Sequence, residues 1–396
     1  MSPEDDQIYS QVSRNSPMGA LLRRYWIPAL LSDEAKAGAA PVRVRLLGED
    51  LIAYRSANGD IGLLDEKCAH RGSSLYFAHN EADGLRCWYH GWKYATSGQC
   101  LEMPNEPRGA DLLTRMRQLA YPCRERNGVV WAYMGPAENM PEMPHLEYLQ
   151  VAPTQHYVSK RIQDCHWTQG MEGDLDPSHI AHLHGNAFSA REAAGPQSNT
   201  WIREGMSPIV EIEAHGAGVM FAARRDAGDD KYFWRVAHWF APFFTMVPAH
   251  PGAGPLFGHA WVPRDEHSSS LYTFTWHPQR ALTDEERRGF LSGERTHAEL
   301  IPGTHQPARN RSNAYVDPAA ADAAQPWMRI TRIQDQDIAV TESIGAHFDR
   351  SEENLGASDA VIARVRRTLL EAARSVDSGL QLPGSNPLDY RRRQVS

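Results

Sequence analysis

The sequence predicts a small all-β domain followed by a larger α+β domain, and three observations support this fold class. Short apolar runs separated by turn residues fill residues 40–136. The proline-rich stretch GPAENMPEMPHLEY then breaks this pattern, and longer strand-like runs mixed with helical segments come after it. The 396 residues also suffice for about two or three domains of ordinary size. We therefore expect a lead-in over 1–39, the all-β domain over 40–145 and the α+β domain over 146–396.

Composition excludes several classes of protein. A formal net charge of −8 leaves no excess of basic residues for binding nucleic acid. Five cysteines are too few for the disulfide framework of a secreted protein. No apolar run approaches the ~20 residues of a membrane span, and Pro28 interrupts LRRYWIPALL too early for an export signal. We expect a cytoplasmic protein that has neither nucleic acid nor a membrane as a partner.

The alternating pattern of the first domain predicts β-strands. Apolar and polar residues alternate through PVRVRLLGEDLIAYRSANGDIGLLDEK, and Asn58-Gly59 lies between two of its runs. Alternation around an Asn-Gly pair is a strong hairpin signal, because both residues accept the positive φ angles of a tight turn. Similar short runs continue as far as GVVWAYMGP. An all-β domain is the simplest structure for this segment.

The second domain has longer strand-like runs and late helices. The runs are joined by short polar connections, as in an antiparallel sheet, and they are GVMFAARR, KYFWRVAHWFAPFFTMV, PLFGHAWVP and SLYTFTWHP. Residues 279–328 are largely polar and are expected to form a long excursion. Two helices should follow it. The last is predicted over 358–376, with Ser358 as N-cap and with Val361, Val365, Leu369 and Val376 along one apolar stripe.

The first group of metal-capable residues lies in CAHRGSSLYFAHNEADGLRCWYHGW. It supplies Cys68, His70, Cys87 and His90, and a glycine closely follows each histidine. These residues match either a structural zinc site or a [2Fe–2S] cluster with two cysteines on one iron and two histidines on the other. The single residue between Cys68 and His70 is a tighter gap than zinc ligands usually have, which favours the cluster. The other cysteines are expected to be small buried apolar residues: Cys100, Cys123 and Cys165.

The second group lies in WTQGMEGDLDPSHIAHLHG, where Asp176, His179 and His184 form the pattern D-x-x-H-x₄-H. Asp176 before a proline is expected to cap a helix, which places His179 in its first turn. The two histidines are separated by ~140° on an ideal helix, so they can share a metal only if the helix ends near His184. His182 competes for the same role. Glu172 and Asp174 are expected in a solvated loop.

A carboxylate that could complete this site lies far downstream, in MRITRIQDQDIAVTESIG. Helical periodicity places Asp337 within an apolar stripe and Asp335 nearly opposite to it. A carboxylate on a buried face needs a partner or a metal, and two histidines with one carboxylate hold Fe(II) with open positions. We therefore expect Asp337 to be the third ligand and Asp335 to be a surface acid.

These motifs together carry a family resemblance. CAHRGSSL and CWYHGW resemble the Rieske signature C-x-H-R-G…C-x-x-H-G-W. The order of motifs, with PMGALLRRYWIPALL near the start and ENLGASDAVIARVRRTLLEAA near the end, resembles the oxygenase components of the phthalate 4,5-dioxygenase group of Rieske non-heme iron oxygenases. The resemblance implies an α+β fold in which an all-β Rieske [2Fe–2S] domain precedes a helix-grip catalytic domain.

The resemblance also implies roles for individual residues. The cluster ligands would be Cys68, His70, Cys87 and His90, and the Fe(II) ligands would be His179, His184 and Asp337. Asp176 would bridge a ligand histidine and the cluster histidine, His70 or His90, of a neighbouring subunit in a homotrimer. Arg235, which shares a strand face with apolar residues, is the first candidate to bind a substrate carboxylate. Weaker candidates are Arg203, Arg224 and Arg225.

The activity implied is that of a terminal oxygenase. It would use O₂ and electrons from an NAD(P)H-dependent flavin and ferredoxin-type reductase to hydroxylate an aromatic compound, first of all an aromatic carboxylate by cis-dihydroxylation. One alternative is a monooxygenase of the same architecture that carries out O-demethylation or aryl-ether cleavage. A second alternative, of another class, is a non-catalytic Rieske electron carrier.

Overall fold

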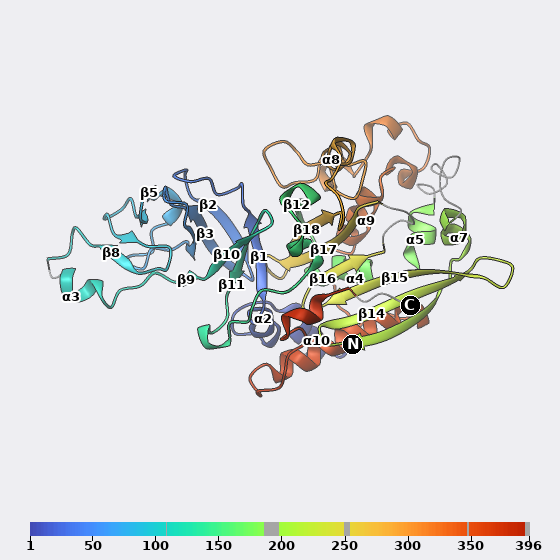
Figure 1. Ribbon diagram of the computed structural model, residues 1–396, viewed down its shortest axis with the longest axis horizontal. Coiled ribbons are helices and arrows are strands. Elements are labelled where there is room, and N and C mark those ends of the chain that lie inside the picture. The colour runs from blue at the N-terminus through green and yellow to red at the C-terminus, as the bar shows by residue number, and fades with distance from the viewer. Residues whose placement is uncertain (108, 186–197, 249–253, 347, 393–396) are drawn as a thin grey trace. The chain divides into compact units, whose positions relative to one another are not determined.

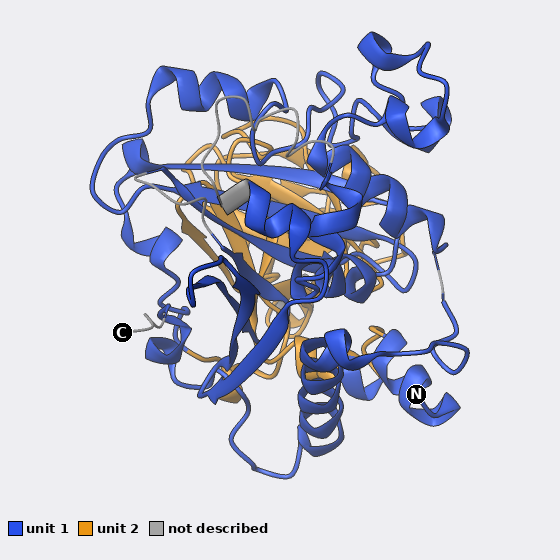
Figure 2. Ribbon diagram, turned by 90° about the vertical axis from the view of Figure 1, so that its right-hand side faces the viewer, with its two compact units in different colours: residues 1–11, 16–18, 142–396 blue, residues 12–15, 19–141 orange. Residues whose placement is uncertain are grey.

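The computed structural model describes residues 1–107, 109–185, 198–248, 254–346 and 348–392. The chain divides into two compact units (Figure 2). Unit 1 consists of Met1–Gln11, Ser16–Met18 and Glu142–Ser396, and unit 2 consists of Val12–Asn15 and Gly19–Pro141. The domain bounds that we predicted, 1–39, 40–145 and 146–396, stay predictions.

Unit 2 is built from small antiparallel sheets, as the alternating pattern predicts. One sheet has the order β1-β11-β10, with β1 Trp26–Leu31, β10 Cys123–Arg126 and β11 Val129–Tyr133. The next has the order β2-β3-β4-β9, with β2 Val42–Leu46, β3 Glu49–Arg55, β4 Ile61–Asp65 and β9 Ala120–Tyr121. The third has the order β5-β6-β7-β8, with β5 His79–Asn80, β6 Leu85–Arg86, β7 Lys93–Tyr94 and β8 Cys100–Glu102.

Two details of unit 2 test the local predictions. Asn58 and Gly59 lie in the turn between β3 and β4, where Gly59 has a φ of 96° that a residue with a side chain rarely adopts. The predicted hairpin is therefore confirmed. Strand β1, which lies in the segment predicted to be a lead-in, pairs with β11. Short helical segments are also present: α3 Gly109–Leu113 and two 3₁₀ turns, Leu75–Phe77 and Ala137–Asn139, belong to unit 2, and α2 Pro17–Leu22 has residues in both units.

Unit 1 is organised around a seven-stranded antiparallel sheet of order β12-β18-β17-β16-β15-β14-β13 (Figure 1). Its strands are β12 His156–Gln163, β13 Ile209–His215, β14 Gly218–Asp226, β15 Tyr232–Phe240, β16 Phe244–Val247, β17 Leu256–Pro263 and β18 Ser269–Trp276. Strands β13 to β18 follow one another as a meander, and β12 pairs with β18. The strands that we predicted form this sheet, except that one predicted run is split into β15 and β16. The sequence patterns missed β12 and β13.

Helices pack against this sheet and against one another. Helix α4 Trp167–Leu175 contacts β16, β17 and helix α9 Ile333–Ser343. Helix α10 Ala360–Ser375 contacts α4, β13, β14 and helix α1 Pro3–Ser10. The other α-helices among the described residues of unit 1 are α5 His179–Leu183, α7 Ser198–Glu204 and α8 Asp284–Leu291. The α+β fold class is confirmed, with an all-β domain followed by a sheet covered by helices.

The start of α10 differs from the prediction. Ser358 lies in a short 3₁₀ turn, Ala357–Asp359, and the N-cap is Asp359. The carboxylate of Asp359 accepts a hydrogen bond from the backbone N–H of Gly356, so it closes the turn that leads into the helix. The predicted apolar stripe is correct at Val361, Val365 and Leu369, which are buried.

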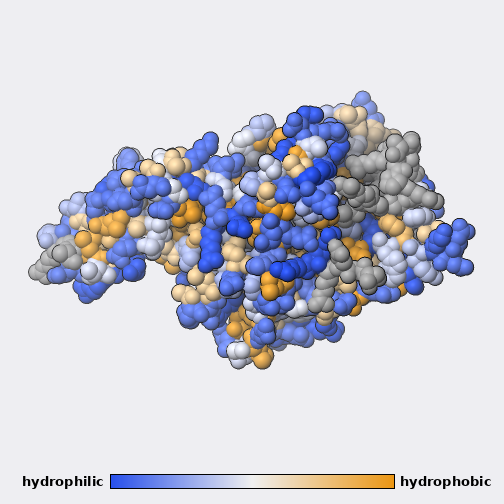
Figure 3. Space-filling view, viewed as in Figure 1, coloured by the Kyte–Doolittle hydropathy of each residue, from blue (hydrophilic) through white to orange (hydrophobic). Residues whose placement is uncertain are grey.

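The described part of the chain contains no helix that is long and apolar enough to cross a membrane. On the face drawn in Figure 3, apolar residues are interspersed with polar ones. Both observations agree with the composition, in which no long apolar run occurs.

Candidate active site and iron centres

The four residues predicted to hold a cluster lie in two turns of unit 2 that share a backbone pattern. Cys68 and His70 follow β4, and Cys87 and His90 lie between β6 and β7. In each turn a glycine N–H donates back to the cysteine carbonyl, from Gly72 to Cys68 at 2.8 Å and from Gly91 to Cys87 at 3.0 Å. Both glycines have positive φ angles, 71° and 75°. Glycine is therefore needed at the same place in each turn.

These turns separate the cysteines from the histidines. Cys68 and Cys87 are buried, whereas His70 and His90 are half-buried and their rings are 4.6 Å apart. The hydroxyl of Tyr94 lies 3.1 Å from Cys68 Sγ, and the His70 ring stacks on Trp92 at 4.3 Å. Burial raises the pKa of the Cys68 thiol, so a thiolate at this position requires a cation. Buried sulfurs with histidines nearer the surface fit a cluster that has one cysteine-bound and one histidine-bound iron.

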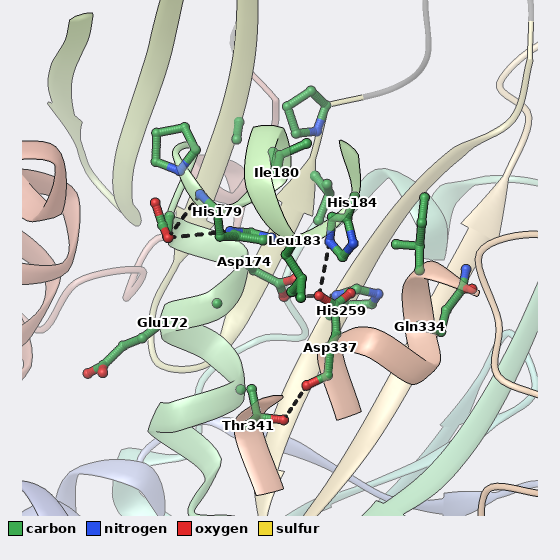
Figure 4. A pocket seen from close by; sticks show the side chains of 18 of the residues that line it. Glu172, Asp174, His179, Ile180, Leu183, His184, His259, Gln334, Asp337 and Thr341 are labelled. Carbon is green, nitrogen blue, oxygen red and sulfur yellow. Dashed lines mark hydrogen bonds and ion pairs between the residues drawn. The ribbon is translucent and has the colours of Figure 1, made fainter. Parts of the chain in front are cut away.

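The second group converges in unit 1 (Figure 4). One ligand atom each from His179, His184 and Asp337 lies within 4.8 Å of the other two. His184 Nε2 is 3.1 Å from Asp337 Oδ1, and the two imidazole rings are 5.2 Å apart at an angle of 80°. Two imidazoles and one carboxylate that face a common point fit Fe(II), which this donor set binds with positions left open.

Local structure explains how the two histidines come together. Helix α5 begins at His179 and ends at Leu183, and His184 leaves the helical path with φ −98° and ψ 3°. The helix therefore ends where a shared metal requires it to end. Gln336 on α9 is 2.8 Å from His184 Nδ1, which turns Nε2 towards Asp337. His182, the competing histidine, is exposed on α5.

Asp176 contacts the same turn, although it is not the N-cap that we predicted. The N-cap of α5 is Ser178, because Asp176 and Pro177 form the turn that joins α4 to α5. The Asp176 carboxylate accepts hydrogen bonds from Ser178 N at 2.7 Å and His179 N at 3.3 Å, and Oδ2 lies 3.4 Å from His179 Nδ1. Burial raises the pKa of Asp176, but His179 and these hydrogen bonds outweigh burial and bring it to about 2. The carboxylate is ionised beside His179 at neutral pH.

The two aspartates of α9 have environments opposite to those we predicted. Asp335 is 1% exposed and pairs with Arg309, which also donates to Glu299 at 3.1 Å. The Asp337 side chain is 39% exposed and faces a cavity. Ile333 and Val340 of α9 and Ile344 at its C-cap line this cavity with their apolar side chains. The prediction that Asp335 is a surface acid is wrong, because an apolar stripe can face a cavity as well as a core.

Glu172 and Asp174 were also predicted wrongly, since both lie on α4 and both are paired. Arg366 donates to Glu172 through two nitrogens at 2.6 and 2.8 Å. Asp174 Oδ2 lies 2.8 Å from His259 Nδ1 and accepts hydrogen bonds from Thr245 and Trp261, each at 2.6 Å. Burial raises the pKa of Asp174, but His259 and these hydrogen bonds hold it below its ordinary value. The donors come from β16 and β17, which the local sequence could not reveal.

The cavity beside the His179, His184 and Asp337 group has a volume of about 950 Å³. Its walls come from α4, α5, α9 and one face of the sheet, including the apolar residues Phe221, Ala237 and Phe257. Arg161 of β12, which we did not predict, also lines it and is 6% exposed. The combination of an apolar wall with a few charged groups is typical of a small-molecule site.

Arg235 lines this cavity together with Arg225 of the adjacent strand. The Nη1 atoms of both are buried and have no hydrogen-bond partner among the described residues. Burial, and then the charge of Arg225, lowers the pKa of Arg235 to about 10. The other candidates point elsewhere: Arg224 stacks over Tyr232 at 4.5 Å and Arg203 pairs with Glu204.

Comparison with known proteins identifies the family. A family model described as LigXa C-terminal domain like matches residues 132–394, and the Rieske [2Fe-2S] domain model matches residues 25–120. The 3-chlorobenzoate-3,4-dioxygenase oxygenase subunit of Comamonas testosteroni is 33% identical over 391 residues, which cover 96% of this chain and 90% of the relative. The chain belongs to the Rieske non-heme iron oxygenases.

Other relatives of this Rieske oxygenase differ in activity. The phthalate 4,5-dioxygenase oxygenase subunit of Pseudomonas putida is 33% identical over 96% of this chain and 88% of its own length. The 5,5'-dehydrodivanillate O-demethylase oxygenase subunit of Sphingobium sp. is 30% identical over 96% of this chain and 82% of its own length. A solved structure, the NdmA QL mutant of Pseudomonas putida with theobromine, has a TM-score of 0.65 at 19% identity and covers 94% of this chain and 97% of its own. That structure supports the fold alone.

The family membership resolves two alternatives that the sequence left open. The protein is a Rieske-type aromatic-ring-hydroxylating oxygenase, with a Rieske [2Fe–2S] cluster and a mononuclear iron site as cofactors. A structural zinc and a non-catalytic electron carrier are therefore excluded. Because its relatives are oxygenase subunits, the protein is one component of a multicomponent system.

Proposed function

We propose that this oxygenase cis-dihydroxylates an aromatic carboxylate. The observation that carries the proposal is a pair of guanidiniums, those of Arg225 and Arg235, whose Nη1 atoms are buried and unpartnered among the described residues and which lie in the wall of the cavity beside the two histidines and Asp337. A buried cation without an anionic partner is costly, and a carboxylate that accepts hydrogen bonds from arginine compensates it. Two relatives with more than nine-tenths of this chain aligned are named for oxidising 3-chlorobenzoate and phthalate, both carboxylates.

In the proposed reaction, separate groups of residues hold the iron, hold the cluster and orient the substrate. His179, His184 and Asp337 hold Fe(II), and Cys68, His70, Cys87 and His90 hold the cluster. When bound, the iron supplies O₂ chemistry and the cluster supplies electrons one at a time. Gln336 orients His184, Arg235 orients the substrate, and the apolar walls exclude water from it.

Asp176 and the surroundings of the cluster suggest how electrons arrive. We propose a homotrimer in which Asp176 bridges His179 and a cluster histidine of a neighbouring subunit. Supporting this, two large aromatic side chains in the turn between Cys87 and His90 are exposed: Trp88 by 72% and Tyr89 by 57%. Exposed aromatics next to a functional group are typical of an interface. An NAD(P)H-dependent flavin and ferredoxin-type reductase completes the system, and a native mass of three chains is the expected result.

The relative named as an O-demethylase supports a second candidate, monooxygenation of an aryl ether. The two are distinguished by product mass under ¹⁸O₂, with iron-replete protein, a surrogate reductase and a panel of benzoates, phthalates and aryl ethers. Two labelled atoms in a ring diol are expected. One labelled atom with release of formaldehyde or a phenol would instead establish the monooxygenase. If no acid gave a product while uncharged aromatics did, the carboxylate proposal would be wrong.

A test of Arg235 itself uses the arginine on the other face of the sheet as a matched control. Arg235→Met should raise the KM for the acid about 10- to 100-fold, as expected for loss of a buried charge-assisted hydrogen bond. Arg224→Met should leave KM unchanged, because Arg224 stacks on Tyr232 outside the cavity lining. Equal KM values for the two variants would show that Arg235 does not bind the substrate.

A further inference from the structure

Arg225 connects the sheet wall of the cavity to the turn that carries Asp176 and His179. The side chain begins on β14 and is 2% exposed. Its Nη2 donates to Pro177 O at 2.6 Å, and its Nε donates to Gly205 O at 3.1 Å. Pro177 directly follows Asp176 and belongs to the turn whose N–H groups bind the Asp176 carboxylate. One guanidinium therefore touches both the cavity wall and the backbone beside a proposed iron ligand.

The third nitrogen of this guanidinium lacks a hydrogen-bond partner among the described residues. Arg225 Nη1 is buried and has no hydrogen-bond partner among the described residues, and the same is true of Arg235 Nη1. The pairing of β14 with β15 places Ala223 opposite Arg235 and Arg225 opposite Phe233, so the two arginines are close neighbours on one face of the sheet. In the described residues no acidic side chain lies within ion-pair distance of either arginine, and the charge of the Asp176 carboxylate acts on Arg225 from beyond that distance. Two like charges with unpaired donors favour an anion between them.

We propose that Arg225 is a positioning residue, which couples binding of the substrate anion to the geometry of the Asp176–His179 turn. This inference rests on the proposed function, because the anion is the carboxylate of the aromatic substrate. The guanidinium is rigid and planar, so a carboxylate that draws Nη1 into a new hydrogen bond also moves Nη2. Since Nη2 holds the Pro177 carbonyl, this movement reaches Asp176 and His179. Substrate occupancy is thereby transmitted to the iron ligand and to the residue proposed to face the incoming electron.

Arg235 and Arg225 thus differ in role. Arg235 reaches the cavity, and its unpaired Nη1 is available to bind the anion. Arg225 holds two backbone carbonyls in addition, so its contribution is to link two sites as well as to bind. Lysine at position 225 keeps the positive charge but lacks the fork that can hold a carboxylate and a carbonyl at once. Arg225→Lys should therefore still bind the anion but no longer transmit its binding to the Asp176–His179 turn.

The test uses the holoenzyme with its cluster oxidised and nitric oxide as a spin probe of the mononuclear iron. Benzoate, 3-chlorobenzoate and phthalate are titrated by calorimetry, and the electron paramagnetic resonance of the nitric oxide adduct is recorded with and without the acid. In the wild type, the acid that binds is expected to change the rhombicity of the signal. In Arg225→Lys, the same acid should bind within about tenfold of the wild-type affinity while the signal stays unchanged.

Arg224→Lys is the matched control, since it changes the neighbouring arginine outside the cavity lining and should behave as the wild type. If Arg225→Lys bound the acid and showed the full wild-type change in rhombicity, Arg225 would have no coupling role. The proposal that the cavity binds an anionic substrate would be unaffected. If none of the acids bound to the wild type, the proposed function itself would fail. These two failures are therefore distinguishable.

A second measurement needs no variant and covers the case in which Arg225→Lys does not fold. Coupling between two sites is reciprocal, so mononuclear iron must change the affinity for the acid by the same factor as the acid changes the affinity for iron. The Kd of the bound acid is expected to differ about 5- to 150-fold between wild-type protein with and without its mononuclear iron. Equal Kd values in the two states would overturn the proposal.

Discussion

The two proposed iron centres of this chain are built in different ways. The four cluster residues come from two short turns, and each turn is closed by its own glycine N–H. The mononuclear group joins the end of α5 to Asp337 of α9, far along the chain, and Gln336 aligns them. The first centre depends on local backbone geometry and the second on the packing of two helices. A defect in one centre should therefore leave the other intact.

The largest expected effect comes from removing one ligand of each centre. Cys87→Ala should abolish the visible absorption of the cluster, and Asp337→Ala should keep that absorption while losing the mononuclear iron. Each should lower product formation by at least about a hundredfold, more than the loss of an outer residue costs. Cys100→Ala, at a buried cysteine outside the motif, is the matched control and should retain the cluster. Normal iron content in Asp337→Ala would show that the ligand assignment is wrong.

The second prediction compares the two aspartates of α9. Asp335→Ala leaves buried Arg309 with Glu299 as its remaining acidic partner and removes the buried half of the network, so it should lower the free energy of unfolding by about 3 kcal/mol. Asp337→Ala removes a cavity-facing carboxylate and should change it by less than about 1 kcal/mol in chelator-treated protein. Urea unfolding of the two variants measures both values. Similar destabilisation by the two changes would contradict the assignment of a structural role to one and a ligand role to the other.

The third prediction concerns Asp176, which contacts a ligand histidine without completing the ligand group. Asp176→Asn keeps the size of the side chain but loses its charge, and it should lower product formation about 10- to 100-fold. Iron content should equal that of the wild type, and the slow step should be reoxidation of the cluster in a single turnover with substrate. If the cluster of Asp176→Asn were reoxidised at the wild-type rate, Asp176 would have no role in electron transfer.

The smallest expected effect is on stability in acid. The folded-state pKa of Asp176 is about 2, below its ordinary value of 3.8. A lowered carboxyl pKa stabilises the folded protein above the ordinary pKa, and this contribution is lost as the pH falls from about 4 to about 2. In chelator-treated protein, Asp176→Asn should be less stable than the wild type by up to about 2 kcal/mol near pH 5, with the difference shrinking below pH 4. A difference that did not vary with pH would contradict this.

The same contrast explains how much the sequence could predict. Cys68, His70, Cys87 and His90 are recognisable because their ligand spacing is short and each turn needs its own glycine. His179 and His184 could be paired by supposing that the helix ends between them, and α5 does end there. The antiparallel sheet was predictable from runs joined by short polar turns, whereas β12 and β13 were missed although each pairs with a predicted strand, β18 and β14.

Tertiary contacts set the limit of prediction. The sequence predicted a buried position for Asp337 and a surface position for Asp335, and the structure shows the reverse. Helical periodicity identifies an apolar face of a helix but not whether that face meets a core or a cavity. The partners of Asp174 lie on strands far along the chain. The hydrogen bond from Arg225 to Pro177 likewise joins segments that only the fold brings together.

The most direct test of two separate iron centres is the ratio of iron to acid-labile sulfide in the wild-type protein as isolated and reconstituted. A Rieske cluster with a mononuclear iron predicts about three irons and about two sulfides per chain. In addition, nitric oxide should produce a resonance from the mononuclear iron while the cluster stays oxidised. About two irons and two sulfides per chain, with no nitric oxide signal, would contradict the existence of the site formed by His179, His184 and Asp337.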